Sequence, residues 1–248
     1  MKRVLAVFLF SFFTLGCEDA AVFFKGPPPP VPFVLDVLVD ASEDSSGSPA
    51  TATSVVTMAA RSVADRPGSL IRVWVLGPTV GRTRIVSTAT VPSPHRAGKR
   101  FREATKDAFL RDTLPVLLNP VIAALKEPAP RRTPLVQSLL LIALAEAPVH
   151  AERHLVAITD LRESELWGEC SRPPNVERVN ELLRATNCPT RLSGVKVSFA
   201  YCGLRPAKNP RCGLSVTAYE ELRNFWRQWV AANGGTATFH LAEPLLND

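Results

Sequence analysis

Short apolar runs rich in β-branched residues alternate with helical segments from residue 33 onward. The runs that predict strands are Phe33–Val39, Leu70–Leu76, Thr83–Val91, His154–Ile158, Val195–Tyr201 and Thr236–Leu241. The segments that predict helices are Thr51–Ala64, Lys99–Glu127, Leu135–Glu146, Asn175–Ala185 and Val216–Ala232. Strands that alternate with helices pair in parallel, so this pattern predicts a three-layer α/β sandwich with helices on both faces of a mostly parallel sheet. The polar, Thr-rich Thr83–Val91 is expected at the edge of the sheet, and we expect one edge strand to be antiparallel.

Several helix boundaries can be predicted from single residues. Thr51 or Thr53 is expected to cap the first helix. Lys99–Glu127 contains two prolines, which predict two pieces or a kinked helix. Thr133 is expected to cap the next helix, with Pro134 in its first turn. That helix is apolar almost all round, so it should be buried.

Length and charge exclude some classes of protein. The chain has 248 residues, of which 46% are hydrophobic, which is enough to bury a substantial core. It shows no internal repeat and no second domain. The formal charge of +6 is dispersed, without a long basic run or a stripe of basic and aromatic residues. A nucleic-acid partner is therefore not expected.

The first residues are typical of an export signal. Met1-Lys2-Arg3 is a positive start, and Val4–Leu15 is an apolar stretch too short to span a bilayer, which needs about 20 residues. We therefore assign residues 1–16 to a signal peptide. The prolines of Gly26–Pro30 favour an extended spacer, so residues 17–32 are assigned to a tether and residues 33–248 to the folded domain.

Thr14-Leu15-Gly16-Cys17 resembles the lipobox of bacterial lipoproteins. This resemblance implies that Cys17 becomes the lipid-modified first residue of the mature chain. The protein would then be anchored to a membrane on the periplasmic side of a bacterial cell envelope. The alternative is an ordinary secretory signal, which would leave a secreted or soluble periplasmic protein.

Four further cysteines suggest two disulfides in an exported chain. They are Cys170, Cys188, Cys202 and Cys212. Three pairings are possible, and we favour Cys170–Cys188 with Cys202–Cys212 because each would close a local loop. No C-x-x-C pair occurs, so a zinc site is not expected.

Oxygen-bearing side chains follow two of the predicted strands. Asp40, Ser42 and Asp44 alternate directly after the first strand, Thr133 precedes the buried helix, and Asp160 follows the fourth strand. Because ligands of parallel α/β sheets gather at the carboxyl ends of the strands, we expect these residues at one edge. Carboxylates, hydroxyls and waters are the ligands that a hard divalent cation prefers.

Three short motifs resemble the von Willebrand factor type A family. The chain has Asp40-Ala-Ser42-Glu-Asp44, Thr133-Pro134-Leu135 and Thr159-Asp160-Leu161 where members carry Asp-x-Ser-x-Ser, Thr-Pro-Leu and Thr-Asp-Gly. The resemblance implies a doubly wound, Rossmann-like fold and a metal-ion-dependent adhesion site for Mg²⁺ or Mn²⁺. By that resemblance Asp40, Ser42 and Thr133 would reach the cation and Asp160 would act through water. A carboxylate of a partner protein often completes the site in this family.

The chain departs from the family at two positions. Asp44 replaces Ser, which adds charge, and Leu161 replaces Gly, which could alter the turn after Asp160. Arg131 and Arg132 could attract an acidic partner, or they could be solvated loop residues. Asp36, alone in an apolar strand, could support the site or be paired elsewhere.

These features favour an exported, lipid-anchored, cation-using protein-binding module that is not an enzyme. The alternative is a metal-free structural scaffold of an envelope assembly, in which the fold is kept without the metal. A metal-dependent hydrolase fits less well, because G-x-S-x-G and H-E-x-x-H motifs are missing. Three aromatic side chains of the last predicted helix are expected in the core rather than around a ligand: Phe225, Trp226 and Trp229.

Overall fold

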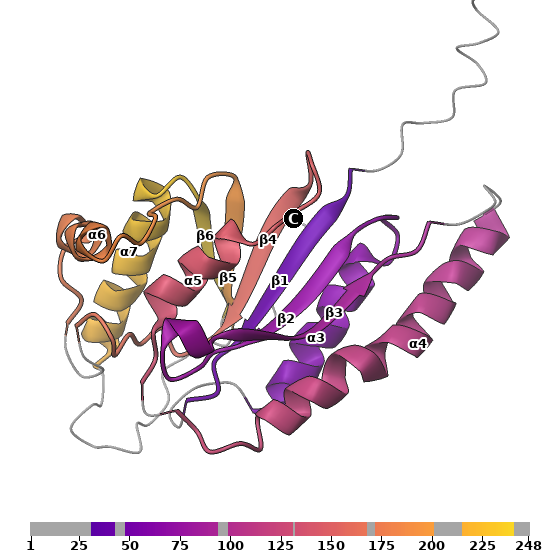
Figure 1. Cartoon of the computed structure of the whole chain (residues 1–248), viewed down its shortest axis with the longest axis horizontal. Coiled ribbons are helices and arrows are strands. Elements are labelled where there is room, and N and C mark those ends of the chain that lie inside the picture. The colour runs from indigo at the N-terminus through magenta and orange to yellow at the C-terminus, as the bar shows by residue number, and fades with distance from the viewer. Residues whose placement is uncertain are drawn as a thin grey trace, which may run out of the picture. The chain divides into compact units, whose positions relative to one another are not determined.

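The computed structural model describes residues 31–42, 48–93, 99–130, 132–167, 172–200 and 215–240. Within these residues a six-stranded sheet has the order β3-β2-β1-β4-β5-β6 (Figure 1). The strands are β1 (Phe33–Val39), β2 (Leu70–Val75), β3 (Arg84–Thr90), β4 (Glu152–Ile158), β5 (Val195–Ala200) and β6 (Thr236–His240). Edge strand β3 is antiparallel to β2, and the other pairs are parallel. The predicted fold class is confirmed.

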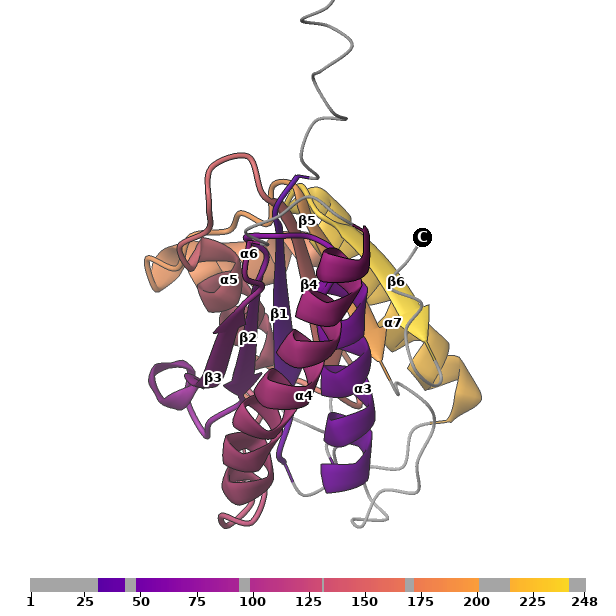
Figure 2. The same cartoon turned by 90° about the vertical axis from the view of Figure 1, so that its right-hand side faces the viewer.

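Helices cover both faces of the sheet. They are α3 (Pro49–Val63), α4 (Lys99–Ala124), α5 (Leu135–Leu144), α6 (Val176–Ala185) and α7 (Val216–Ala232), with a short 3₁₀ turn η1 (Val80–Arg82). Helices α3 and α4 lie together against one face (Figure 2). Helices α5, α6 and α7 contribute to the apolar core of the other. Among the described residues, none of the helices combines the length and hydrophobicity needed to span a lipid bilayer.

Strand β1 is the centre of the core, and all seven of its residues are buried. Successive side chains of a strand point to opposite faces. Leu35 and Val37 accordingly pack in the cluster that includes α3 and α4, whereas Leu38 packs in the cluster of α5 and α7. A strand buried on both faces explains the nearly continuous apolar run in the sequence.

Two predicted helix boundaries need correction. Ser48, rather than Thr51 or Thr53, caps α3: its side chain accepts the Thr51 N–H at 3.2 Å, and Pro49 occupies the first turn. The prediction of two pieces for Lys99–Glu127 is wrong, because α4 is one helix that contains both prolines.

Asp36, the one acid inside β1, forms a buried ion pair with Arg72 of β2. Arg72 Nε donates to Asp36 Oδ1 at 2.6 Å and Nη2 donates to Oδ2 at 2.8 Å, while Trp74 Nε1 donates to Oδ1 at 2.7 Å. The two charged side chains are only 3% and 6% exposed. A bidentate pair of this kind satisfies a carboxylate that could not be buried alone. Asp36 is therefore a structural residue of the sheet.

The same pair connects the sheet to the end of α5. Arg72 Nη1 donates to the carbonyl oxygen of Glu146 at 2.6 Å. Arg153 of β4 donates to the carbonyl oxygens of Ala143 and Ile142, the latter at 3.0 Å. These carbonyls lie at or just beyond the end of the helix, where they lack intrahelical partners and where positive charge is favourable.

Arg72→Ala should lower the free energy of unfolding by about 3–5 kcal/mol, because it leaves the Asp36 carboxylate buried without its counterion. Arg84→Ala is the matched control, since Arg84 pairs with Glu127 at the surface and should cost less than about 1 kcal/mol. Urea denaturation of both variants measures the difference. Equal losses would show that the buried pair does not hold the sheet.

Candidate functional site

The order of the strands reverses between β1 and β4, which lie side by side at the centre of the sheet (Figure 1). In open α/β sheets, ligands bind beyond the carboxyl ends of the strands at such a point. Asp40 follows β1 directly, and its backbone N–H donates to the Ile158 carbonyl at the end of β4 at 3.0 Å. Thr159 and Asp160 follow on β4. The topology thus brings these two polar segments to one edge.

Asp40 is fully buried, and both of its carboxylate oxygens accept hydrogen bonds. Oδ1 accepts the Ser42 N–H at 3.0 Å, and Oδ2 accepts the Thr159 hydroxyl at 3.0 Å. Burial raises the pKa of Asp40, and the hydrogen bonds from Ser42 and Thr159 oppose that rise. The carboxylate therefore ties the turn after β1 to the turn after β4.

Asp160 is paired within its own turn. Its Oδ1 accepts the Arg162 N–H at 3.1 Å, and its Oδ2 lies 3.3 Å from Arg162 Nε. Both side chains are at most 10% exposed. A guanidinium stays protonated at any pH relevant to proteins, so Asp160 has a permanent cation beside it.

Leu161, where the von Willebrand resemblance expects Gly, has a left-handed backbone with φ of 70°. This conformation costs a residue with a Cβ about 1–2 kcal/mol. The Leu161 side chain is fully buried, and its carbonyl accepts the Trp226 Nε1–H of α7 at 2.8 Å. Leu161 thus keeps a conformation that glycine favours, and its packing offsets the strain.

The start of α5 is positioned by the segment after β4. Thr133 was expected to cap this helix, but Pro134 occupies the cap position and no side chain bonds there. Glu163 reaches in instead: its Oε2 accepts the Val136 N–H at 2.8 Å. An anionic or polar oxygen is favourable at a helix start because the first N–H groups are unpaired.

Thr133 is joined to the same segment through its backbone. Its N–H donates to Ser164 Oγ, and its carbonyl accepts the Ser164 N–H at 3.1 Å. Thr133 is 5% exposed. Asp40, Ser42, Thr133 and Asp160 are therefore all carried by three segments that hydrogen bonds connect.

Other predicted site residues lie apart or outside the description. Asp44, Arg131 and Cys17 are outside the described residues, as are Cys170, Cys202 and Cys212. Cys188 is a half-buried free thiol in the part of the chain that the structure describes, so both disulfides stay predictions. Arg132 is exposed at 66% of its side chain and lies 3.5 Å from Glu165.

Three residues that shape this edge were not predicted: Thr159, Arg162 and Glu163. All of them follow β4 within a few positions, which is the one signal in the sequence that could have drawn attention to them. Their partners lie on other segments or depend on a turn geometry that short motifs do not reveal.

The described residues do not fit a divalent cation in this arrangement. A dication needs ligands with net negative charge, but Arg162 neutralises Asp160 and the Asp40 oxygens already accept hydrogen bonds. Within the described ranges, no group of three or more His, Cys, Asp or Glu could hold a metal ion. Asp44 lies outside those ranges, and the magnesium site stays a prediction.

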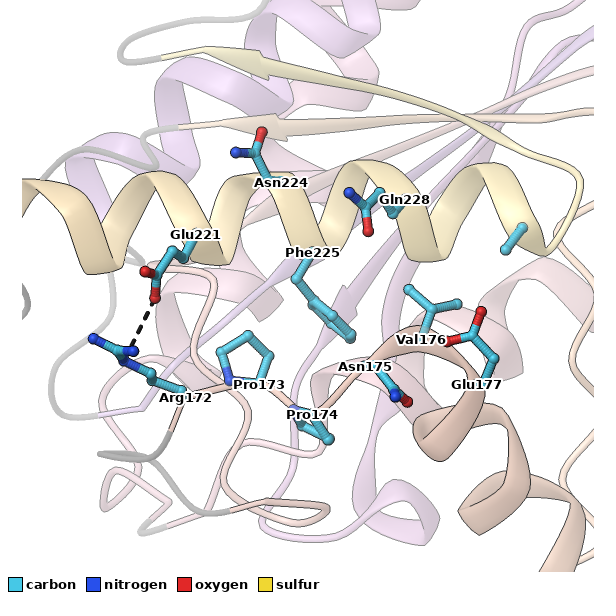
Figure 3. A pocket seen from close by; sticks show the side chains of 11 residues that line it. Arg172, Pro173, Pro174, Asn175, Val176, Glu177, Glu221, Asn224, Phe225 and Gln228 are labelled. Atoms are coloured by element: carbon cyan, nitrogen blue, oxygen red, sulfur yellow. Dashed lines mark ion pairs between the residues drawn. The ribbon is translucent and has the colours of Figure 1, made fainter.

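A second recess lies away from this edge, between α7 and the segment that leads into α6 (Figure 3). Its volume is about 550 Å³. Phe225 points into it, Asn224 and Gln228 lie along α7, and an ion pair of 3.5 Å joins Arg172 to Glu221 (Figure 3). Its described lining contains no Ser, Cys or His, so it has no nucleophile for catalysis. Phe225, Trp226 and Trp229 are buried, so their prediction as core residues is confirmed.

No family model and no curated protein matches this chain. Two solved structures are similar. A von Willebrand factor type A protein from Catenulispora acidiphila has 15% identity and a TM-score of 0.38; the match covers 84% of this chain and 38% of that one. The conserved hypothetical protein BatB from Bacteroides thetaiotaomicron has 14% identity and a TM-score of 0.34, with 86% and 91% covered. This chain thus spans well under half of the first protein. The strand order and antiparallel edge strand of the structure itself give the von Willebrand factor type A-like α/β fold.

The buried Glu163 carboxyl should make stability depend on pH. Burial raises its pKa from 4.5 to about 7, against hydrogen bonds from three backbone N–H groups. The folded chain therefore holds a proton between these values that the unfolded chain has released, and the stability from this proton is complete below the lower value and lost as pH rises through the upper one. Wild type should lose on the order of 3 kcal/mol relative to Glu163→Gln across that window.

Chemical denaturation of both proteins at a series of pH values measures this difference. Glu181→Gln, at an exposed ion pair with Arg178, is the control and should show no such trend. A constant difference between wild type and Glu163→Gln would mean that Glu163 does not change protonation in this range.

Leu161→Ala and Leu161→Gly together separate packing from backbone strain. Each removes a buried side chain and should cost about 2–4 kcal/mol. Glycine should be the more stable of the two by about 1 kcal/mol, because it adopts positive φ without strain. At Leu139, inside α5, the order should reverse, since glycine weakens a helix relative to alanine by about 1 kcal/mol. Thermal unfolding of the four variants tests this; the same order at both positions would contradict it.

Proposed function

We propose that this chain is an exported, lipid-anchored protein-interaction module whose partner binds at the carboxyl edge of the sheet. The observation that carries the proposal is the gathering of Asp40, Thr133 and Asp160, from three separate segments, at the point where strand order reverses. Anchoring would occur through Cys17, on the periplasmic side of a bacterial envelope. The fold supports a role in binding, and none of the residues at this edge is assigned a catalytic role.

The partner is proposed to be a protein that presents an acidic side chain. Arg132 is exposed beside Thr133 at this edge, and its distance of 3.5 Å from Glu165 describes a weak surface pair. An exposed guanidinium can exchange such a pair for a bidentate one with a partner carboxylate. Arg131 adds a neighbouring positive charge in the sequence.

Metal-free recognition, as in the scaffold hypothesis, is the form that the site favours. The supporting observation is the buried guanidinium of Arg162 against Asp160. The alternative form would use Mg²⁺ or Mn²⁺ on Asp40, Ser42, Asp44, Thr133 and Asp160, as the family resemblance implies. Both forms share the same edge, and a chelator separates them.

Arg132→Glu should abolish partner capture, because it replaces attraction to an acidic group by repulsion. Tagged full-length chain would be recovered from envelope extracts and its co-purifying protein quantified by mass spectrometry. We expect at least about a tenfold loss, which corresponds to about 1.4 kcal/mol. Arg191→Glu makes the same charge change in the exposed loop before β5, at the opposite edge, and should leave capture intact.

Capture should also survive a chelator. Equal recovery with Arg132→Glu and wild type would place the partner elsewhere on the molecule. Loss of the partner on chelation alone would instead support the cation-dependent form of the site.

A further inference from the structure

Arg162 is one of the few charged side chains buried at the carboxyl edge, with 7% of its side chain exposed. Arginine is almost never buried unless its charge is compensated. Its Nε lies 3.3 Å from Asp160 Oδ2, and its own backbone N–H donates to Oδ1 of the same carboxylate at 3.1 Å. Asp160 and Arg162 therefore form a closed unit within one turn.

The turn that holds this unit is itself fixed. Leu161, between the two charged residues, has its side chain buried and its carbonyl bonded to Trp226 of α7. Thr159, just before them, accepts the Leu161 N–H at 3.1 Å and donates to Asp40. The guanidinium is thus held against Asp160 by a turn with little freedom to move away.

A guanidinium and a divalent cation compete for the same carboxylate. Both neutralise negative charge, and a cation brought near Arg162 would be repelled by it in a buried, weakly screened environment. The guanidinium has the advantage of being covalently tethered, so no ion has to be drawn from solution and stripped of its waters.

We propose that the Arg162 guanidinium is the resident cation of this site, and that removing it exposes a latent site for a divalent metal ion formed with Asp40 and Asp160. The inference deepens the metal-free form of the proposed function. It says nothing of the partner, and it is tested by metal binding alone. Its failure would therefore leave the protein-interaction proposal standing.

Mn²⁺ binding to the purified full-length chain, followed by electron paramagnetic resonance of the free ion, tests this inference. Wild type should bind no Mn²⁺ at this edge at millimolar concentrations. Arg162→Gln should bind at least about tenfold more tightly, a gain of about 1.4 kcal/mol. The double variant Arg162→Gln/Asp160→Asn should lose the gain.

Two further variants serve as controls. Arg162→Lys keeps the positive charge and should resemble wild type, whereas Arg178→Gln breaks an exposed pair with Glu181 and should also bind no ion. Tight binding by wild type that Asp160→Asn abolishes would overturn the proposal. A folded Arg162→Gln chain without any gain would overturn it as well.

The wild-type chain provides a test that needs no folded variant. Its melting temperature should be the same in MgCl₂ and in NaCl of equal ionic strength, because a cation bound only to the folded state would raise it. A rise that is specific to Mg²⁺ would contradict an internal cation.

Discussion

The bidentate ion pair between Asp36 and Arg72 holds the centre of this molecule together. It lies between the two central strands β1 and β2, and through the remaining guanidinium nitrogen it also bonds the carbonyl of Glu146 beyond α5. Helix α5 is apolar on nearly every side, so hydrophobic burial alone would leave its rotation and position along the sheet weakly defined. Directional bonds from Arg72 and Arg153 to its final carbonyls define them. The apolar core supplies the free energy, and the buried polar groups supply the register.

The opposite end of α5 depends on the turn after β4. Glu163 bonds the first turn of the helix, Ser164 bonds Thr133 on both sides of its peptide, and Leu161 accepts strain so that this turn can reach them. Strained residues persist where the surroundings over-determine them, as the bond from Trp226 does here. The candidate site is thus a by-product of the same contacts that hold α5 at both ends. Its residues are ordered by the fold before any ligand arrives.

The layers of the fold and its edge strand could be predicted because the periods of strands and helices are local properties of the sequence. The partners of Asp36 could not, since Arg72 meets it only through the register of two strands 36 positions apart. The cap of α5 shows the same limit. Thr133 has the right chemistry one residue before Pro134, yet Glu163 bonds the helix from 27 positions away. Arg162 is only two residues from Asp160, but their pairing depends on a left-handed residue between them that a Leu does not announce.

Asp36–Arg72 and Asp160–Arg162 are two instances of one device, a buried carboxylate neutralised by an arginine of the same chain. The first lies inside the sheet and bonds carbonyls of the helix end, so it can only be structural. The second lies at the carboxyl edge, where a family site would be charged and open. With its charge cancelled internally, Asp160 contributes little field to the surface, because the two opposite charges are 3.3 Å apart. The exposed charge at this edge then comes from side chains such as Arg132, which is positive. A surface of that sign selects an acidic partner directly, whereas a bare carboxylate edge would need a metal ion as intermediary. The sign of the charge beside Asp160 therefore decides which of the two modes of recognition this fold can use.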